Sequence, residues 1–186
     1  MNEDEATLAV IATLVELGIG YVVVGSLSSN AYGVPRSTQD ADILIELGSN
    51  TISRLAARLG PAFHVDPQMS FETVTMTTRH VLTIPSLSFR IELFHLSDDP
   101  HDQERFRRRR AYTMFGRTVS MPTPEDVVIT KLRWTLLGRR GKDRDDLLNV
   151  LAVQGQTLDW DYIYQWCDQH GTRALLDEIR QSVPKV

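Results

Sequence analysis

Residues 22–46, VVVGSLSSNAYGVPRSTQDADILIE, hold the strongest structural signal in this chain. They begin with an apolar run that is typical of a buried strand. Small residues after Gly25-Ser26 favour a short helix, and the turn-forming residues 33–35 require a loop. A second strand is predicted to begin at Asp40. Because side chains alternate along a strand, Asp40 and Asp42 project from the same face.

Other segments show helical or strand periodicity around this stretch. Thr123-Pro124-Glu125-Asp126 is a strong helix start, with a hydroxyl cap, proline at the first position and acids in the first turn. The sequence predicts an α+β fold, in which a mixed β-sheet core has flanking helices and a helical C-terminal part. We expect helices at residues 8–15, 52–59, 101–110, 123–138, 143–152 and 162–179, and strands at 71–76, 81–84, 89–94, 112–115 and 117–121.

Carboxylates on two predicted strands carry the first chemical signal. Two acids at positions i and i+2 of a strand lie about 6 to 7 Å apart at their Cα atoms and can share hard cations such as Mg²⁺. In FRIELFHL, residues 89–96, Glu92 is a charge inside an otherwise apolar strand, on the same face as Arg90. If this strand lies beside the one that carries Asp40 and Asp42, the three carboxylates form a candidate metal site.

The order of these features resembles the signature of the polymerase-β-like nucleotidyltransferase superfamily, which is a strand, Gly-Ser or Gly-Gly, a short helix, and Asp-x-Asp. The resemblance implies that Gly25 and Ser26 hold the β- and γ-phosphates of a nucleoside triphosphate (NTP). It also implies that Asp40 and Asp42 bind two Mg²⁺ ions, with Mn²⁺ as an alternative, and that Glu92 takes the third carboxylate position. Gly-Ser stands here where a double glycine is commoner, and Glu92 stands where an aspartate is frequent.

A second segment, PTPEDVVITKLRW at 122–134 followed by GKDRDD at 141–146, extends the resemblance. It is similar to the C-terminal part of abortive-infection-type (MenT-like) toxin nucleotidyltransferases. This similarity implies a helix lysine and a later aspartate in the active site, together with two further phosphate-binding cations. The residues are Lys131, either Asp143 or Asp146, and Lys142 with Arg36.

Together the resemblances imply a Mg²⁺-dependent enzyme that transfers a nucleoside monophosphate from an NTP to a hydroxyl acceptor, such as tRNA, and releases pyrophosphate. A cognate antitoxin protein is a further implied partner. Residues 1–121 are then the nucleotidyltransferase core and residues 122–186 a helical part packed on it, or the two form a single domain.

Basic residues gather in one tract of an otherwise acidic chain. Residues 105–144 contain twelve Arg or Lys and three Asp or Glu, although the formal net charge of the chain is −4. Such a tract attracts nucleic acid or holds nucleotide phosphates, and a solvated helix face is the alternative for the four arginines at 107–110. The tract favours RNA as the acceptor, with a protein or a small molecule such as an aminoglycoside as alternatives.

Composition disfavours several other classes of protein. The N-terminal residues are acidic and no apolar run approaches the length of a membrane span, so we expect a cytoplasmic protein without a membrane partner. The single Cys167 excludes an internal disulfide. The five histidines fall in separate predicted elements, which indicates scattered surface positions and no zinc site. Trp134 and Trp166 have apolar neighbours and are interpreted as core or interface residues.

Two further function classes stay open. One is a non-catalytic nucleotide-binding or partner-binding module of a toxin–antitoxin pair. The other is a nucleic-acid-binding protein that uses only the arginines between Arg105 and Arg110, which predicts salt-dependent binding without any nucleotide requirement. Metal-dependent release of pyrophosphate separates the enzyme from both.

Overall fold

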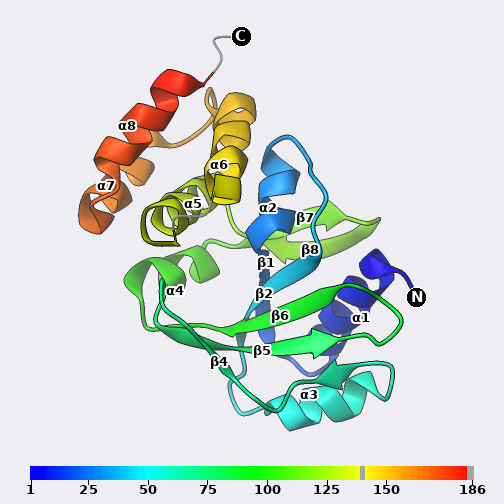
Figure 1. Ribbon diagram of the computed structural model, residues 1–186. Helices are drawn as coiled ribbons and strands as arrows, with labels where there is room; N and C mark the ends of the chain where they lie inside the picture. The colour runs from blue at the N-terminus through cyan, green and yellow to red at the C-terminus, as the bar shows by residue number, and fades with distance from the viewer. Residues whose placement is uncertain (139–140, 184–186) are drawn as a thin grey trace.

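The computed structural model describes residues 1–138 and 141–183. In this part of the chain a mixed sheet with α1 and α3 forms one half of the molecule, and the helices α5–α8 gather in the other (Figure 1). The predicted α+β fold with a helical C-terminal part is confirmed. The helices are α1 (Glu3–Glu16), α2 (Gly25–Tyr32), α3 (Ile52–Leu59), α4 (Pro100–Arg107), α5 (Pro124–Gly138), α6 (Gly141–Gln154), α7 (Trp160–His170) and α8 (Arg173–Ser182). The strands are β1 (Gly20–Val24), β2 (Asp40–Glu46), β3 (His64–Val65), β4 (Ser70–Glu72), β5 (Thr77–Thr83), β6 (Arg90–His95), β7 (Arg110–Met114) and β8 (Arg117–Met121).

The main sheet has the strand order β1-β2-β6-β5-β3, and β4 also pairs with β5. Its central pair, β2 and β6, is parallel, while β1 and β5 run antiparallel to their neighbours. The strands β7 and β8 form a separate hairpin. The central pairing matters for function because it places the strand of Asp40 and Asp42 directly beside the strand of Glu92.

Of the three hydrophobic clusters among the described residues, the two larger ones follow the two halves of the molecule. One lies on the sheet face that carries Ile43 and Ile91, where α1, α3 and the β7–β8 hairpin cover it. The other lies among α5, α6, α7 and α8 and includes Tyr32 of α2. Within the described ranges, no helix combines the length and the apolar character that crossing a membrane requires.

Helix starts follow the capping residues in the sequence. Asn2 and Glu5 form a reciprocal capping box on α1, and Asp99 accepts N–H bonds at the start of α4, where Pro100 takes the first position. The hydroxyl of Thr123 accepts the N–H of Asp126 at 3.3 Å, as expected for the start of α5. The predicted helix at 123–138 is therefore confirmed with its cap.

The structure corrects several predicted boundaries. The helix expected at 162–179 is two helices, because Gly171 adopts a left-handed conformation (φ 67°) that ends α7. The strand expected at 71–76 ends at Glu72, and a turn with Met76 at φ 54° precedes β5. The helix expected at 101–110 ends earlier, because the chain enters β7 at Arg110, and the two-residue β3 was not predicted.

Four of the five histidines do not lie at scattered surface positions, which is a further correction, and only His64 is exposed. His80 and His95 lie with their ring centroids 5.2 Å apart in the sheet half, and His101 and His170 lie 5.5 Å apart beside α5. Burial lowers the pKa of all four imidazoles. They are neutral packing groups in pairs that only the tertiary fold creates.

Candidate active site

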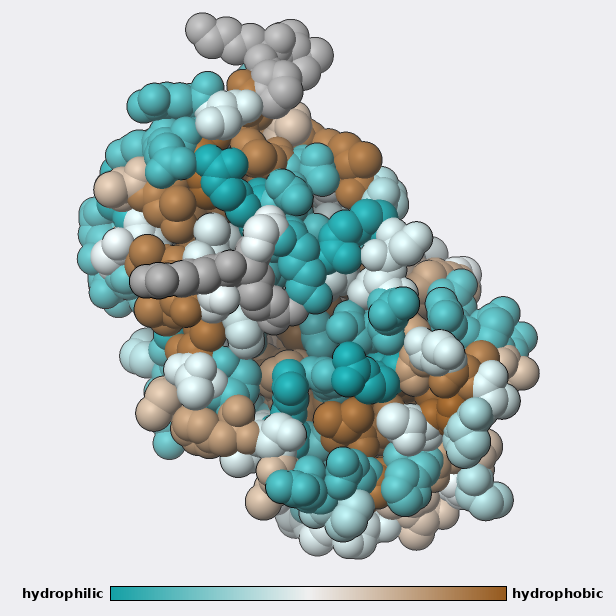
Figure 2. Space-filling view, in the orientation of Figure 1, coloured by the Kyte–Doolittle hydropathy of each residue, from teal (hydrophilic) through white to brown (hydrophobic). Residues whose placement is uncertain are grey.

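A cleft of about 370 Å³ opens between the sheet and the C-terminal helices. The ends of β1, β2 and β6, the first turn of α2 and one side of α5 line it. Figure 2 shows the surface hollowed between the two halves, with hydrophilic residues along the sheet side. Most predicted site residues line this cleft: Gly25, Ser26, Asp40, Asp42, Glu92, Lys131, Lys142 and Asp143.

Gly25 brings the backbone directly against a carboxylate. Its φ is 61°, and a Cβ atom at this position would lie 1.9 Å from Oδ2 of Asp42. Only glycine allows both the left-handed conformation and this approach. The same residue starts α2, and Val24 before it provides no side-chain cap. The first N–H groups of α2 therefore lie beside the strand that carries Asp42, in an arrangement suited to phosphate oxygens.

The strand register brings the candidate carboxylates together at the backbone level. In the parallel pair of β2 and β6, Asp42 is the partner of Glu92, and Asp40 is the partner of Arg90. Asp40, Asp42 and Glu92 all line the cleft. Three carboxylates on adjacent strands supply the oxygen donors that Mg²⁺ and Mn²⁺ prefer.

The carboxylates nevertheless have other partners in this structure. Oδ1 of Asp40 accepts a hydrogen bond from the Thr38 hydroxyl at 2.7 Å, and Oε2 of Glu92 lies 2.6 Å from Nη1 of Arg79. Among the described residues, no group of three or more His, Cys, Asp or Glu side chains is arranged to hold a metal ion. The donor types and backbone positions fit a divalent cation, which Glu92 could bind only by giving up its ion pair with Arg79.

Lys131 lies on α5 across the cleft from the sheet. Its Nζ is 2.7 Å from Oδ1 of Asp143 and 2.8 Å from Oδ2 of Asp146. All three side chains are buried. The structure thus joins Lys131 to both of the aspartates between which the sequence left a choice.

The two aspartates differ in what else they contact. Asp143 lines the cleft, whereas Asp146 lies behind it and accepts two hydrogen bonds from Arg36, at 2.6 and 2.9 Å. Burial alone would raise the pKa of Asp146, but the bonds from Arg36 and the nearby Lys131 hold this pKa below its ordinary value. Arg36 also donates to the Ser26 hydroxyl at 2.8 Å. Arg36 and Asp146 therefore connect α2 to α6 from outside the cleft lining.

Several solved structures with a similar fold are those of nucleotidyltransferases or nucleotidyltransferase-like proteins. The antibiotic-resistance factor ANT(2'')-Ia superposes with a TM-score of 0.63 and 13% identity, over 98% of this chain and 99% of that chain. A nucleotidyltransferase-like protein from Paracoccidioides brasiliensis gives 0.53 and 16% identity over 100% and 95%. The lincosamide antibiotic adenylyltransferase LnuA, with lincomycin bound, gives 0.51 and 11% over 82% and 98%. The chain has a nucleotidyltransferase fold. By sequence, neither a family model nor a curated protein matches it.

Sequence reasoning missed several residues that line the cleft of this nucleotidyltransferase fold. Arg79 lies on β5, and only the pairing of β5 with β6 brings it to Glu92. Trp134 lines the cleft and is partly exposed, so of the two roles predicted for it, core or interface, the core role does not hold. Arg90 had a sequence signal, because strand alternation already placed it on the face of Glu92. The other missed residues include Glu72, Asp126 and Thr130.

Asp126 anchors a buried polar network at one end of the cleft. Its carboxylate accepts hydrogen bonds from the Tyr162 hydroxyl at 2.7 Å and the Thr123 hydroxyl at 2.8 Å, and lies 3.2 Å from Nε2 of His101. Burial would raise the pKa of Asp126, yet these partners hold it below its ordinary value. Burial and the nearby Asp126 raise the pKa of Tyr162. The network ties α4, α5 and α7 together at this end of the cleft.

The arginines of the basic tract have partners within the fold. Arg105 is buried and lies 2.7 Å from Asp102, Arg107 pairs with Glu104 at 2.6 Å, and Arg108 stacks on Tyr162 at 3.9 Å. Arg109 stacks on Phe106 at 4.1 Å, and Arg110 lies over Tyr32 at 5.7 Å. Arg107, Arg109 and Arg110 nevertheless stay exposed, and Arg110 already lies in β7, so the four arginines at 107–110 do not form one solvated helix face. RNA as the acceptor stays a prediction.

Proposed function

We propose that this protein transfers a nucleoside monophosphate from an NTP to a hydroxyl group of an acceptor and releases pyrophosphate. The observation that carries the proposal is the register of β2 and β6, which pairs Asp42 with Glu92 beside the uncapped start of α2. Carboxylates for metal ions and N–H groups for phosphates thus meet in one cleft.

Asp40, Asp42 and Glu92 would hold two Mg²⁺ or Mn²⁺ ions. Such ions, when bound, neutralise the triphosphate and activate the acceptor hydroxyl. The backbone at Gly25 and Ser26 would orient the β- and γ-phosphates. Glu92 lies on the far side of Asp42 from α2. It would therefore mark the end of the cleft where the acceptor hydroxyl binds, and it would accept the proton of that hydroxyl.

Cations on the helical side would stabilise the charge that develops on the phosphates. Lys131 and Lys142 line the cleft, and Asp143 holds Lys131 in place. Arg36 and Asp146 lie outside the cleft lining. Arg36 would act through Ser26, and Asp146 would act through Lys131. We assign them positioning roles.

The acceptor is a separate proposal. A small hydroxyl-bearing molecule is favoured by the solved structures of similar size, among them ANT(2'')-Ia with adenylyl-2''-tobramycin and LnuA with lincomycin. A cleft of about 370 Å³ is also in the range of small-molecule sites. An RNA end such as that of tRNA, a toxin role and a cognate antitoxin rest on the resemblance of residues 122–146. A cytoplasmic location is likewise a proposal.

The experiment that tests the function uses each labelled NTP with Mg²⁺ or Mn²⁺. Total RNA, tobramycin and lincomycin serve as acceptors, and Asp40→Asn and Asp42→Asn proteins serve as inactive controls. We expect label on an acceptor and pyrophosphate in solution, both lost in the two variants and with chelator. Nucleotide binding without pyrophosphate would instead establish the non-catalytic module.

A further inference from the structure

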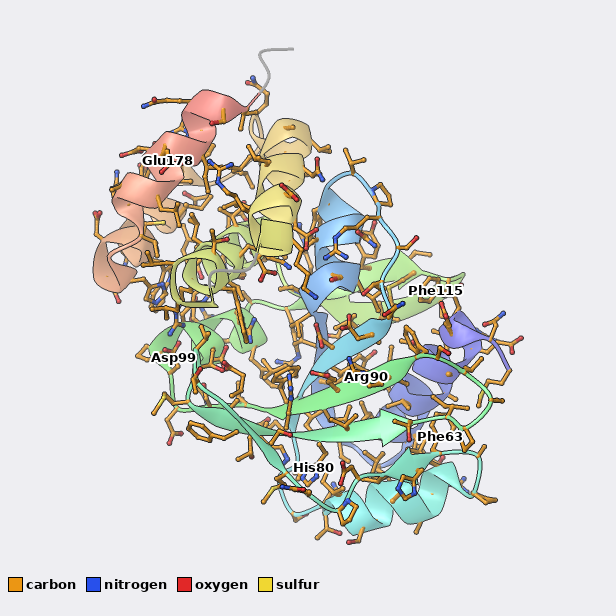
Figure 3. All side chains as sticks on the ribbon, in the orientation of Figure 1. Phe63, His80, Arg90, Asp99, Phe115 and Glu178 are labelled. Carbon is orange, nitrogen blue, oxygen red and sulfur yellow. The ribbon has the colours of Figure 1, made fainter. Side chains whose placement is uncertain are left out.

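Two arginines flank Glu92 on the cleft-facing side of the sheet. Arg79, on β5, lies 2.6 Å from the Glu92 carboxylate, and its guanidinium is 5.6 Å from the Phe94 ring centre. Arg90 lies at the start of β6, two residues before Glu92, and lines the same cleft (Figure 3). The backbone N–H of Arg90 donates to the Gln39 carbonyl at 3.1 Å, but its exposed side chain forms no ion pair or hydrogen bond within residues 1–138 and 141–183.

The other acids of the cleft are already engaged with the fold. Glu72 accepts the N–H groups of Val74 and Thr75, the latter at 2.8 Å. Asp126 is held by the Tyr162, Thr123 and His101 side chains, and Asp143 accepts from Lys131. Of the described acids that line the cleft, only Glu92 pairs with an arginine of the sheet, so Arg79 depends on Glu92 for its counter-charge.

The proposed metal site would compete with Arg79 for Glu92. If Glu92 turns to a cation, Arg79 loses its counter-charge while two-thirds of its side chain stays covered. The buried Nε–H of Arg79 already has no hydrogen-bond acceptor among the described residues. A desolvated guanidinium without an anion is unfavourable, so a new anion would replace the Glu92 carboxylate.

We infer that the acceptor presents a phosphate group to Arg79, close to the hydroxyl that reacts, with Arg90 adding positive charge at the mouth of the cleft. Guanidinium groups bind phosphate oxygens through paired hydrogen bonds. The inference rests on the proposed function, since it takes Glu92 to mark the hydroxyl end. It disfavours polycationic acceptors such as tobramycin, because two arginines would repel them.

Two kinds of acceptor carry such a phosphate, namely a nucleic acid, in its backbone, and a small sugar phosphate. Matched pairs of probes distinguish them. The first pair is an RNA dinucleotide with a phosphodiester and the same dinucleotide with a neutral methylphosphonate. The second pair is ribose 5-phosphate and ribose. Binding is measured calorimetrically with Mg²⁺ and a non-transferable α,β-methylene NTP, so that turnover is not needed for the readout.

We expect the phosphate-bearing member of one pair to bind at least about tenfold more tightly than its neutral partner. The preference for the phosphate-bearing probe should be lost in Arg79→Gln and reduced in Arg90→Gln. The nucleotide affinity and the thermal midpoint of each variant are measured to check that it is folded. Arg54→Gln, an exposed arginine on α3 away from the cleft, should keep the full preference.

The outcomes separate this inference from the proposed function. A preference in the dinucleotide pair identifies a nucleic-acid end, and a preference in the ribose pair identifies a small phosphate ester. Equal binding within both pairs, or tighter binding of tobramycin than of every phosphate probe, overturns the inference even if label transfer succeeds. A phosphate preference without pyrophosphate release would instead refute only the transferase activity.

Discussion

Gly25 joins backbone conformation to the chemistry of the site. A Cβ atom there would meet Oδ2 of Asp42 at 1.9 Å, whereas a Cβ atom at Gly18, with a similar φ of 65°, would meet nothing within 4 Å. The two glycines therefore separate the effect of backbone strain from the effect of displacing a carboxylate.

Gly25→Ala and Gly18→Ala should each lower the free energy of unfolding by about 1 kcal/mol, because both place an alanine in the left-handed region. Only Gly25→Ala should also displace Asp42 and reduce nucleotidyl transfer, by about 100-fold. Urea unfolding and label transfer measure the two effects. Similar activities for the two variants would show that Gly25 does not position Asp42.

The buried carboxylate of Asp146 forms ion pairs with two cationic side chains, Arg36 and Lys131. Arg36 and Lys131 hold its pKa below its ordinary value, so its carboxylate stabilises the fold above the unfolded-state pKa of about 4. This contribution is lost as the pH falls through the lower folded-state pKa.

Asp146→Asn should cost about 3 kcal/mol of stability at pH 7, because the buried Lys131 and the partly exposed Arg36 lose their shared anion. The difference in the free energy of unfolding between the variant and the wild type should become smaller as the pH falls below about 4. Chemical denaturation at pH 7, 5 and 3 tests this, with the exposed Asp145→Asn as the control. A difference that does not depend on pH would contradict the ionised pairing.

Among the elements, β2 and β6 show what the sequence can and cannot predict. Alternation within each strand correctly predicted the shared face of Asp40 and Asp42 and the charged position of Glu92. The approach of Arg79 to Glu92 depends on which strands pair, and β5 carries no local signal for its partner. Ring pairs such as His101 with His170 likewise arise from long-range packing. Local periodicity thus predicted the elements, and tertiary contacts created much of the site.

The junction of α5 with α7 depends on the bond between Tyr162 and Asp126. Tyr162→Phe keeps the ring under Arg108 but removes the 2.7 Å hydrogen bond to a fully buried carboxylate. We expect a loss of about 1 to 2 kcal/mol in the free energy of unfolding. Tyr164→Phe removes an exposed contact with Arg180 and should change stability by less than about 0.5 kcal/mol. Equal effects would show that the buried network contributes nothing beyond a surface contact.

Across the whole molecule, the two halves share a sensitivity to acid. Each contains a pair of imidazoles whose pKa burial lowers, His80 with His95 in the sheet half and His101 with His170 in the helical half. As the pH falls through about 6.5, these imidazoles bind protons in the unfolded chain, whereas in the folded protein they stay neutral to a lower pH. Stability should therefore fall from pH 7 to pH 5 in both halves, before the carboxylates titrate.

His170 offers the cleanest test, because burial lowers its pKa to about 4. The folded pKa lies below the unfolded value, so between about pH 6.5 and pH 4 the unfolded state binds the extra proton and gains stability relative to the fold. Between pH 7 and pH 5 the free energy of unfolding should decline by about 1 kcal/mol less in His170→Gln than in the wild type. This value allows for the partial exposure of the His170 side chain. Exposed His64→Gln should leave the decline unchanged. A His170→Gln protein with the wild-type decline would show that the helical half does not bury this imidazole in its neutral form.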